Sequence, residues 1–153
     1  MPLQNAVNDA RAMESVLREM GFEVESVTDA SLRSMEGALD RFVGNLRAGD
    51  VALFYYSGHG IQLGGENYLV PVDYKASDEA EVRYQALPAQ KVLDRMEGRG
   101  TQLNIVILDA CRNNPFLRTR AASGGLAGMT AGKGSYIAFA AAPGKVAWDA
   151  GPA

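Results

Sequence analysis

Two side chains that could serve as a nucleophile and its base each occur once in the 153-residue sequence. They are Cys111 and His59, and each follows an apolar run, residues 103–108 before the cysteine and 51–56 before the histidine. A thiolate attacks carbonyl carbon atoms, and a neighbouring imidazole supplies the base that activates it. Because open α/β sheets bind ligands at the carboxyl ends of their strands, we predict that the two side chains meet there.

The tetrapeptide around the histidine, Ser57-Gly58-His59-Gly60, suits a site that handles peptide carbonyl groups. Its glycines let a substrate backbone approach and let a main-chain amide point into the site. The N–H groups of Gly60 and Cys111 are therefore our candidates for an oxyanion hole. The alternative is structural, because a single buried cysteine is more often a small core residue and a single histidine usually has a structural role. The joint placement favours catalysis.

The composition excludes several classes of function. A net charge of −3 and a sequence pI near 5.2 offer no basic face to nucleic acid. No apolar stretch approaches the roughly 18 residues of a membrane span, so we expect no membrane partner. One histidine and one cysteine do not supply the usual zinc ligands, so we assign no metal. Residues 1–4 show no signal peptide, and the compartment stays unknown, with the cytoplasm as the default.

The first half of the chain predicts helix, strand, helix and strand in turn. An apolar stripe from Ala6 to Met20 indicates a helix that Asn5 or Asn8 caps and Gly21 closes. Residues 22–27 alternate apolar and polar side chains, which is typical of a strand covered on one face. A second amphipathic helix follows Asp29 or Ser31 and stops near residue 49. Residues 51–56 are apolar without alternation, which predicts a strand buried on both faces.

The second half continues the alternation. Residues 64–65 indicate a turn, residues 68–70 a short strand, and residues 90–96 a helix that ends at Gly98. Residues 103–108 predict a second buried strand and residues 135–142 a last one. Residues 118–134 are too poor in large side chains to pack a core, so we predict a flexible loop there. The whole pattern favours a single α/β domain over residues 1–153 with a mainly parallel central sheet.

Two motifs give the sequence a family resemblance. Tyr55-Tyr-Ser-Gly-His-Gly60 and Asp109-Ala-Cys-Arg-Asn113 resemble the paired motifs of the caspase and metacaspase clan of cysteine peptidases, above all its bacterial members. The resemblance extends through residues 3–10, 68–73 and 138–144. The spacing between base and nucleophile, 111 − 59 = 52 residues, is similar to that of caspases, where it is about 50. The resemblance implies a three-layer caspase-like fold in which His59 is the general base and Cys111 the nucleophile of peptide hydrolysis through an acyl-enzyme.

The substrate preference follows from charge. Asp109 stands two residues before the cysteine, where caspases that recognise aspartate carry glutamine, and a carboxylate there attracts arginine or lysine. By resemblance to metacaspases, Asp9, Ser57 and Asp109 line the pocket for this basic side chain, whereas Ala6 departs from relatives that carry cysteine. The alternatives are that Asp9 only interacts with a helix dipole and that Asp109 only forms a turn.

Further expectations concern maturation and calcium. Arg118, Arg120 and Lys133 follow the nucleophile, where clan members are often cut, so an enzyme that prefers basic residues could cut itself there; solvated loop charges are the alternative. Metacaspases often need calcium, and Asp73 matches one such region. The nearby acids Asp78, Glu79 and Glu81 align poorly with that region, so calcium dependence stays open. No other cofactor is expected, and the oligomeric state is not assigned.

The resemblance also implies an apolar strand before residues 3–10, inside the sheet, and a further helix and strand after residue 153. We therefore expect a catalytic domain truncated at both ends and lacking its first strand. Such a fragment would expose two strand edges and be unstable. The preferred function is a cysteine endopeptidase that acts on polypeptides after Arg or Lys, and the alternative is a catalytically silent caspase-like module that binds partners.

Overall fold

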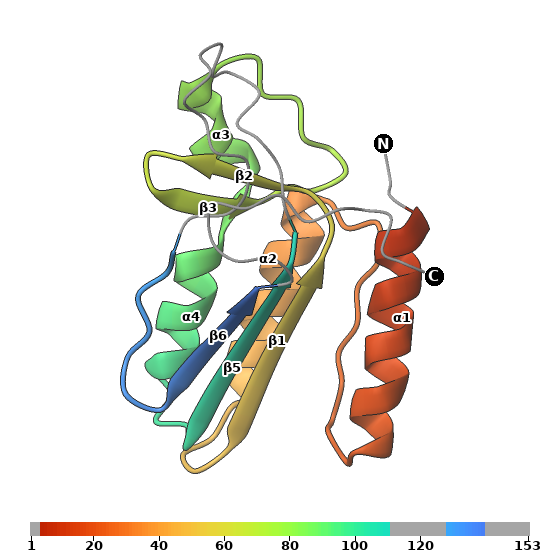
Figure 1. The fold of residues 1–153 in the computed structure, drawn as a ribbon, viewed down its shortest axis with the longest axis vertical. Coiled ribbons are helices and arrows are strands. Elements are labelled where there is room, and N and C mark those ends of the chain that lie inside the picture. Colours follow the sequence, from red (N-terminus) through yellow and green to blue (C-terminus); the bar gives the residue numbers. More distant parts are fainter. Residues whose placement is uncertain (1–3, 111–127, 140–153) are drawn as a thin grey trace.

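The computed structural model describes residues 4–110 and 128–139, and these residues form four helices and six strands (Figure 1). The order of the elements is α1 (Gln4–Glu19), α2 (Leu32–Asn45), β1 (Val51–Ser57), β2 (Gly60–Leu63), β3 (Glu66–Leu69), α3 (Glu79–Gln85), β4 (Leu87–Pro88), α4 (Ala89–Glu97), β5 (Leu103–Asp109) and β6 (Ser135–Phe139). The α/β class predicted from the sequence is confirmed. None of the described helices is long and apolar enough to cross a membrane.

The main sheet is parallel and has the strand order β1-β5-β6. Strands β1 and β5 pair from Val51 opposite Leu103 to Ser57 opposite Asp109. The pairing of β5 with β6 continues the same direction. The carboxyl ends of all three strands therefore lie on the same side of the sheet. This arrangement brings together residues that follow different strands.

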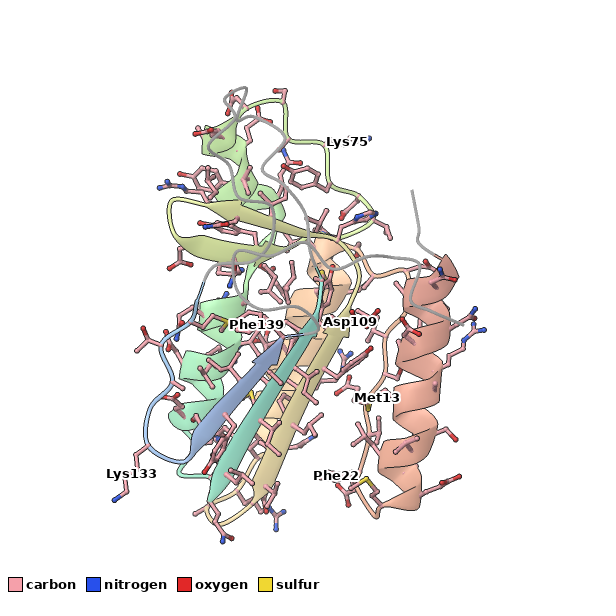
Figure 2. The ribbon with its side chains drawn as sticks, viewed as in Figure 1. Met13, Phe22, Lys75, Asp109, Lys133 and Phe139 are labelled. Atoms are coloured by element: carbon pink, nitrogen blue, oxygen red, sulfur yellow. The ribbon has the colours of Figure 1, made fainter. Side chains whose placement is uncertain are left out.

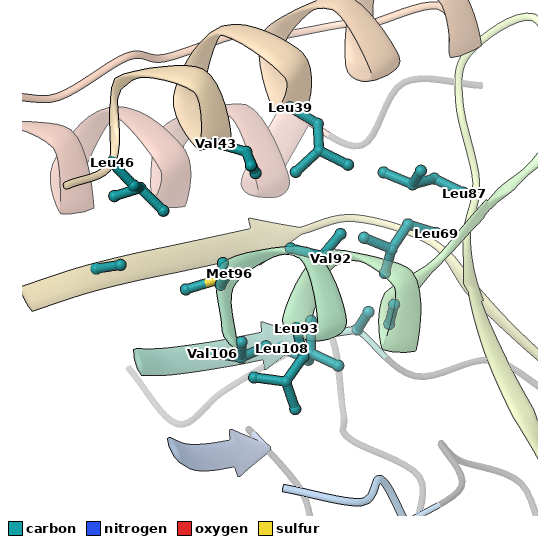
Figure 3. Packing of buried hydrophobic residues seen from close by; sticks show 13 residues of the cluster. Leu39, Val43, Leu46, Leu69, Leu87, Val92, Leu93, Met96, Val106 and Leu108 are labelled. Carbon is teal, nitrogen blue, oxygen red and sulfur yellow. The ribbon is translucent and has the colours of Figure 1, made fainter. Parts of the chain in front are cut away.

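One face of this sheet forms the core with helices α2 and α4 (Figure 3). Val106 and Leu108 of β5 pack there with Leu93 and Met96 of α4, and all four are fully buried. In β5 buried residues alternate with half-buried ones, and Val51 of β1 is exposed. The prediction that both strands are buried on both faces is therefore wrong for the described residues, because helices α2 and α4 cover one face only.

Helix α1 contacts β1 and begins earlier than the capping residues predicted for it. Asn5 and Asn8 both lie inside the helix, so neither is its cap. Residues 22–27 form no strand, and that prediction is wrong. Their extended backbone runs alongside α1 (Figure 1), to which the Arg18 guanidinium ties it by donating to the Val24 carbonyl. Alternating side chains specify one covered face, but a strand also needs a neighbour to pair with.

A cavity of about 440 Å³ separates β1 from α1 and the segment that follows it. Its lining comes from Ala6, Ala10 and Val27 on one side and from Leu53 and Tyr55 of β1 on the other. Among the described residues, β1 pairs only with β5, so its other edge borders this cavity.

Helix α2 begins as the sequence predicted. Ser31 is its N-cap, and its hydroxyl oxygen accepts a hydrogen bond of 3.1 Å from the Ser34 N–H. The Asp73 carboxylate accepts a second bond, of 3.0 Å, from the Leu32 N–H. Two of the amides that a helix start leaves without helical partners are thereby paired.

A small antiparallel sheet, β2-β3-β4, follows the main strand β1. Its hairpin turns at Gly64 and Gly65, both with positive φ, where the sequence predicted a turn. Strand β3 confirms the strand predicted near residues 68–70, and α4 confirms the helix that ends at Gly98. Strand β2 and helix α3 were not predicted. Both are short, and short elements carry little periodic signal.

Candidate active site

The ends of β1 and β5 lie side by side where the two motifs leave the sheet. Ser57 pairs with Asp109, and the Gly58 N–H donates to the Asp109 carbonyl at 3.3 Å. His59 follows Ser57 by two residues, and Cys111 follows Asp109 by two residues. Cys111 itself lies outside the described residues. The last described residue before it is Ala110, which is buried.

Tyr56 fixes the backbone of the turn that carries His59. Its hydroxyl donates to the His59 carbonyl at 2.6 Å and also lies 3.2 Å from the Val70 carbonyl. The Val70 N–H donates to the same His59 carbonyl at 3.0 Å. The His59 backbone is thus held between β1 and the residue that follows β3, while the side chain of His59 is half-buried.

Gly58 leaves room for this arrangement. A Cβ atom at this position would lie 2.7 Å from the Tyr56 hydroxyl oxygen, closer than real Cβ contacts come, and the φ of Gly58 is 157°. Because the Tyr56 ring is part of the packed sheet face, a side chain at residue 58 would displace the hydroxyl from its acceptors. The glycine before the histidine therefore has a steric reason as well as the functional one proposed from the sequence.

Gly60, proposed as an oxyanion donor, is the first residue of β2 and is buried. It pairs with Leu69 of β3, and the adjacent pair, His59 with Val70, is hydrogen-bonded. Hydrogen-bonded and non-hydrogen-bonded pairs alternate along an antiparallel ladder. The alternation makes Gly60 and Leu69 a non-hydrogen-bonded pair, in which the Gly60 N–H points away from β3.

Tyr55 connects the predicted pocket residues. Tyr55 and Ser57 lie on the face of β1 opposite the α2–α4 core, and Asp109 lies on the same face of β5. The Tyr55 hydroxyl donates to the Asp109 carboxylate at 3.4 Å. Burial raises the pKa of Tyr55 to about 12, a hydrogen bond with Ser57 opposes the rise, and the charges of Asp109 and Asp9 add to it.

Asp9 lies exposed on α1, one residue before Ala10, which lines the cavity beside β1. The charge of Asp9, like that of Asp109, adds to the raised pKa of the Tyr55 hydroxyl. Ser57 and Asp109 pair at one end of the sheet, and the assignment of Asp9, Ser57 and Asp109 to one substrate pocket stays a prediction. The sequence analysis gave Tyr55 and Tyr56 no role of their own, although both stand in the histidine motif.

Of the three cations considered for self-cleavage, Arg118 and Arg120 lie outside the described residues. Lys133 is exposed and lies two residues before the start of β6. Because the strands are parallel, Lys133 lies at the end of the sheet where the strands begin, and Asp109 lies at the end where they finish (Figure 2). Residues 128–134 contain no helix or strand, and α4 holds them through a bond from the Gly132 N–H to the Glu97 carboxylate.

Three of the four carboxylates weighed for calcium accept hydrogen bonds from backbone amides. Asp73 accepts from the first turn of α2. Asp78 is the N-cap of α3 and accepts from the Glu81 N–H, while the Glu81 carboxylate accepts from the Ser77 N–H. Within residues 4–110 and 128–139, no three His, Cys, Asp or Glu side chains group closely enough to hold a metal ion.

Comparisons with known proteins show the family to which the chain is similar. A family model described as the caspase domain of peptidase family C14 matches residues 1–153. The human mucosa-associated lymphoid tissue lymphoma translocation protein 1 is 35% identical over 104 residues, which are 68% of this chain and 12% of that protein. The homolog from Mus musculus matches with the same identity and coverage. The chain thus spans about an eighth of the length of these relatives.

Proposed function

Because this chain belongs to the caspase-domain family, we propose that it is a cysteine endopeptidase that hydrolyses peptide bonds after arginine or lysine. The observation that carries the proposal is the register of β1 and β5. With Ser57 opposite Asp109, residues 59 and 111 follow the two strand ends at equal distances along the chain. A base and a nucleophile must come within hydrogen-bond reach, and this register supports such an approach.

In the proposed reaction, His59 takes the proton of the Cys111 thiol, and the thiolate attacks the carbonyl carbon of the scissile peptide bond. The N–H groups of Gly60 and Cys111 donate to the oxyanion of the tetrahedral intermediate. The imidazolium of His59 then gives its proton to the leaving amine, and an acyl-enzyme remains. Water, deprotonated by His59, hydrolyses the thioester and restores the thiol. No metal or other cofactor takes part in these steps.

The preference for basic substrates rests on the two carboxylates near Tyr55. Asp109 and Asp9 both act on the Tyr55 hydroxyl, so negative charge gathers at this end of the sheet. A cation and a carboxylate about 4 Å apart attract by at most roughly 4 kcal/mol at an effective dielectric constant near 20. The same carboxylates repel an acidic side chain, so the proposed order is Arg and Lys well above Asp.

The test compares the unmodified chain with Cys111→Ala and His59→Ala on fluorogenic peptides that end in Arg, Lys or Asp. Loss of the nucleophile should lower the rate by on the order of 10⁶, as in other proteases that lose theirs. Asp94→Asn, at an exposed residue of α4, controls for handling and folding. Equal rates in Cys111→Ala and the unmodified chain would exclude the enzyme and leave the catalytically silent interaction module.

A further inference from the structure

We propose that Tyr55 is a specificity-determining positioning residue, whose hydroxyl orients the Asp109 carboxylate toward the basic side chain of the substrate. The inference rests on the proposed function and goes beyond it. The pocket inferred from the sequence contained Asp9, Ser57 and Asp109 only. Tyr55 is the described side chain that connects all three, through a hydrogen bond and through charge.

The placement of Tyr55 follows from strand geometry. Side chains two residues apart share one face of a strand, so Tyr55 and Ser57 project together. In the parallel register, Asp109 lies opposite Ser57, and Ile107 lies opposite Tyr55. The long Tyr55 side chain therefore reaches diagonally along the sheet to the neighbouring strand, and its hydroxyl comes within 3.4 Å of the Asp109 carboxylate. This distance is long for an O–H···O bond, so the contact restrains the carboxylate without holding it rigidly.

The hydroxyl acts as a donor throughout the neutral range. A tyrosine with the ordinary pKa of 10.0 already keeps its proton in this range, and burial and the nearby carboxylates extend the range by raising the pKa of Tyr55 to about 12. A neutral phenol beside a carboxylate donates to it and leaves its negative charge intact. Tyr55 is therefore suited to orient the charge of Asp109 without neutralising it.

Orientation matters more for arginine than for lysine. A guanidinium group binds a carboxylate through two parallel N–H bonds in a fixed plane, whereas an ammonium group is a point charge with three rotatable donors. A carboxylate that turns freely loses the paired geometry but keeps its charge. Removing the hydroxyl should therefore weaken the recognition of Arg more than that of Lys.

The experiment measures kcat and KM of Tyr55→Phe for peptides that end in Arg and in Lys. We expect kcat/KM for Arg to fall roughly tenfold, mainly through KM, and the value for Lys to fall clearly less. Tyr84→Phe, on the exposed face of α3, is the matched control and should match the unmodified chain. An unchanged ratio of Arg to Lys would overturn the inference, because a purely structural loss lowers both values alike.

A second measurement is independent of catalysis. The carboxyl carbon resonance of Asp109 is followed by NMR against pH in the Cys111→Ala variant, with and without Tyr55→Phe. A carboxylate that loses a donor takes up its proton at higher pH, so the titration should shift upward in the double variant. Identical titrations would also overturn the inference. If the unmodified chain cuts no Arg or Lys peptide, the proposed function fails, while this titration still tests the contact between Tyr55 and Asp109.

Discussion

The Tyr56 hydroxyl donates a hydrogen bond of 2.6 Å to the carbonyl oxygen of His59, three residues later in the chain. The hydroxyl is buried, and this burial raises the pKa of Tyr56 well above its ordinary value. The same carbonyl accepts from the Val70 N–H. The backbone that presents the proposed base is therefore fixed from two directions, by the strand before it and by the residue after β3.

Tyr56→Phe should slow the reaction without weakening substrate binding. The variant keeps the ring and removes the hydroxyl, so the His59 carbonyl loses this bond and keeps the one from the Val70 N–H. We expect kcat for an Arg peptide to fall roughly tenfold and the free energy of unfolding to fall by about 1 kcal/mol, while KM stays within about twofold. Steady-state kinetics measure kcat and KM, and urea denaturation measures the free energy of unfolding. A variant with unchanged kcat would show that the bond does not position the base.

Because the Tyr56 hydroxyl is buried, the stability of the fold should fall as the pH rises above about 10. Its pKa is raised in the folded protein from the ordinary value of 10.0, so the unfolded chain loses the proton first as the pH rises. The contribution to stability is complete below pH 10 and is lost as the pH rises toward the folded value. Urea denaturation at about pH 9 and pH 11 should therefore show a decrease that is smaller in Tyr56→Phe. An equal decrease in both proteins would contradict the assignment.

Gly58→Ala tests the steric reason for the glycine before the histidine. The new methyl group would meet the Tyr56 hydroxyl oxygen at 2.7 Å. We expect a loss of about 1–3 kcal/mol in the free energy of unfolding, together with reduced activity. Gly44→Ala is the matched control: no atom lies near its added Cβ, and alanine inside helix α2 should stabilise by about 0.5–1 kcal/mol. Chemical denaturation measures the free energy of unfolding of both variants. Equal changes in Gly58→Ala and Gly44→Ala would refute the steric explanation.

Asp109→Asn should remove most of the preference for basic substrates. The amide keeps the size of the side chain and removes the charge, so kcat/KM for Arg should fall by up to roughly 10³-fold. The rate of alkylation of Cys111 by iodoacetamide should change far less, because the nucleophile and base remain. Asp94→Asn is the control for a surface carboxylate. If Asp109→Asn kept the preference for Arg over Asp, another group would set the specificity.

Self-cleavage at Lys133 should occur between molecules. Lys133 precedes β6, and Asp109 ends β5, so the length of the sheet separates them, about 3.3 Å for each residue along a strand. Cleavage there should therefore speed up with protein concentration and disappear in Lys133→Gln, as mass spectrometry would show. An intact chain in fully active protein would remove the idea.

The sequence predicted best those elements whose signal is local. Helix α4 and the cap of α2 at Ser31 were found from periodicity and capping residues. The parallel pairing of β1 and β5 followed from the alternation of strands and helices along the chain. Residues 22–27 show the limit of such reasoning. Their pattern is that of a strand, but pairing depends on a neighbour that the pattern does not contain.

The candidate site divides in the same way. His59, Asp109 and Ser57 were proposed from the sequence because motif and spacing mark them, and the register places Ser57 opposite Asp109. Tyr55 and Tyr56 were missed because a tyrosine in an apolar strand has the composition of a core residue. Only the direction of each side chain, across to Asp109 or back to the His59 carbonyl, distinguishes them. The roles of all these site residues stay predictions, and Cys111, Arg118 and Arg120 lie outside the described residues.

The cavity beside β1 has a consequence for substrate selection. It lies between α1, which carries Asp9, and β1, which carries Ser57 and pairs with the strand that carries Asp109. The Asp9 carboxylate therefore belongs to helix α1, which the cavity leaves incompletely packed against the sheet. In the proposed enzyme, a change that fills or opens this cavity is expected to move Asp9 relative to Ser57 and Asp109, so the stability of the packing and the preference for basic substrates should change together.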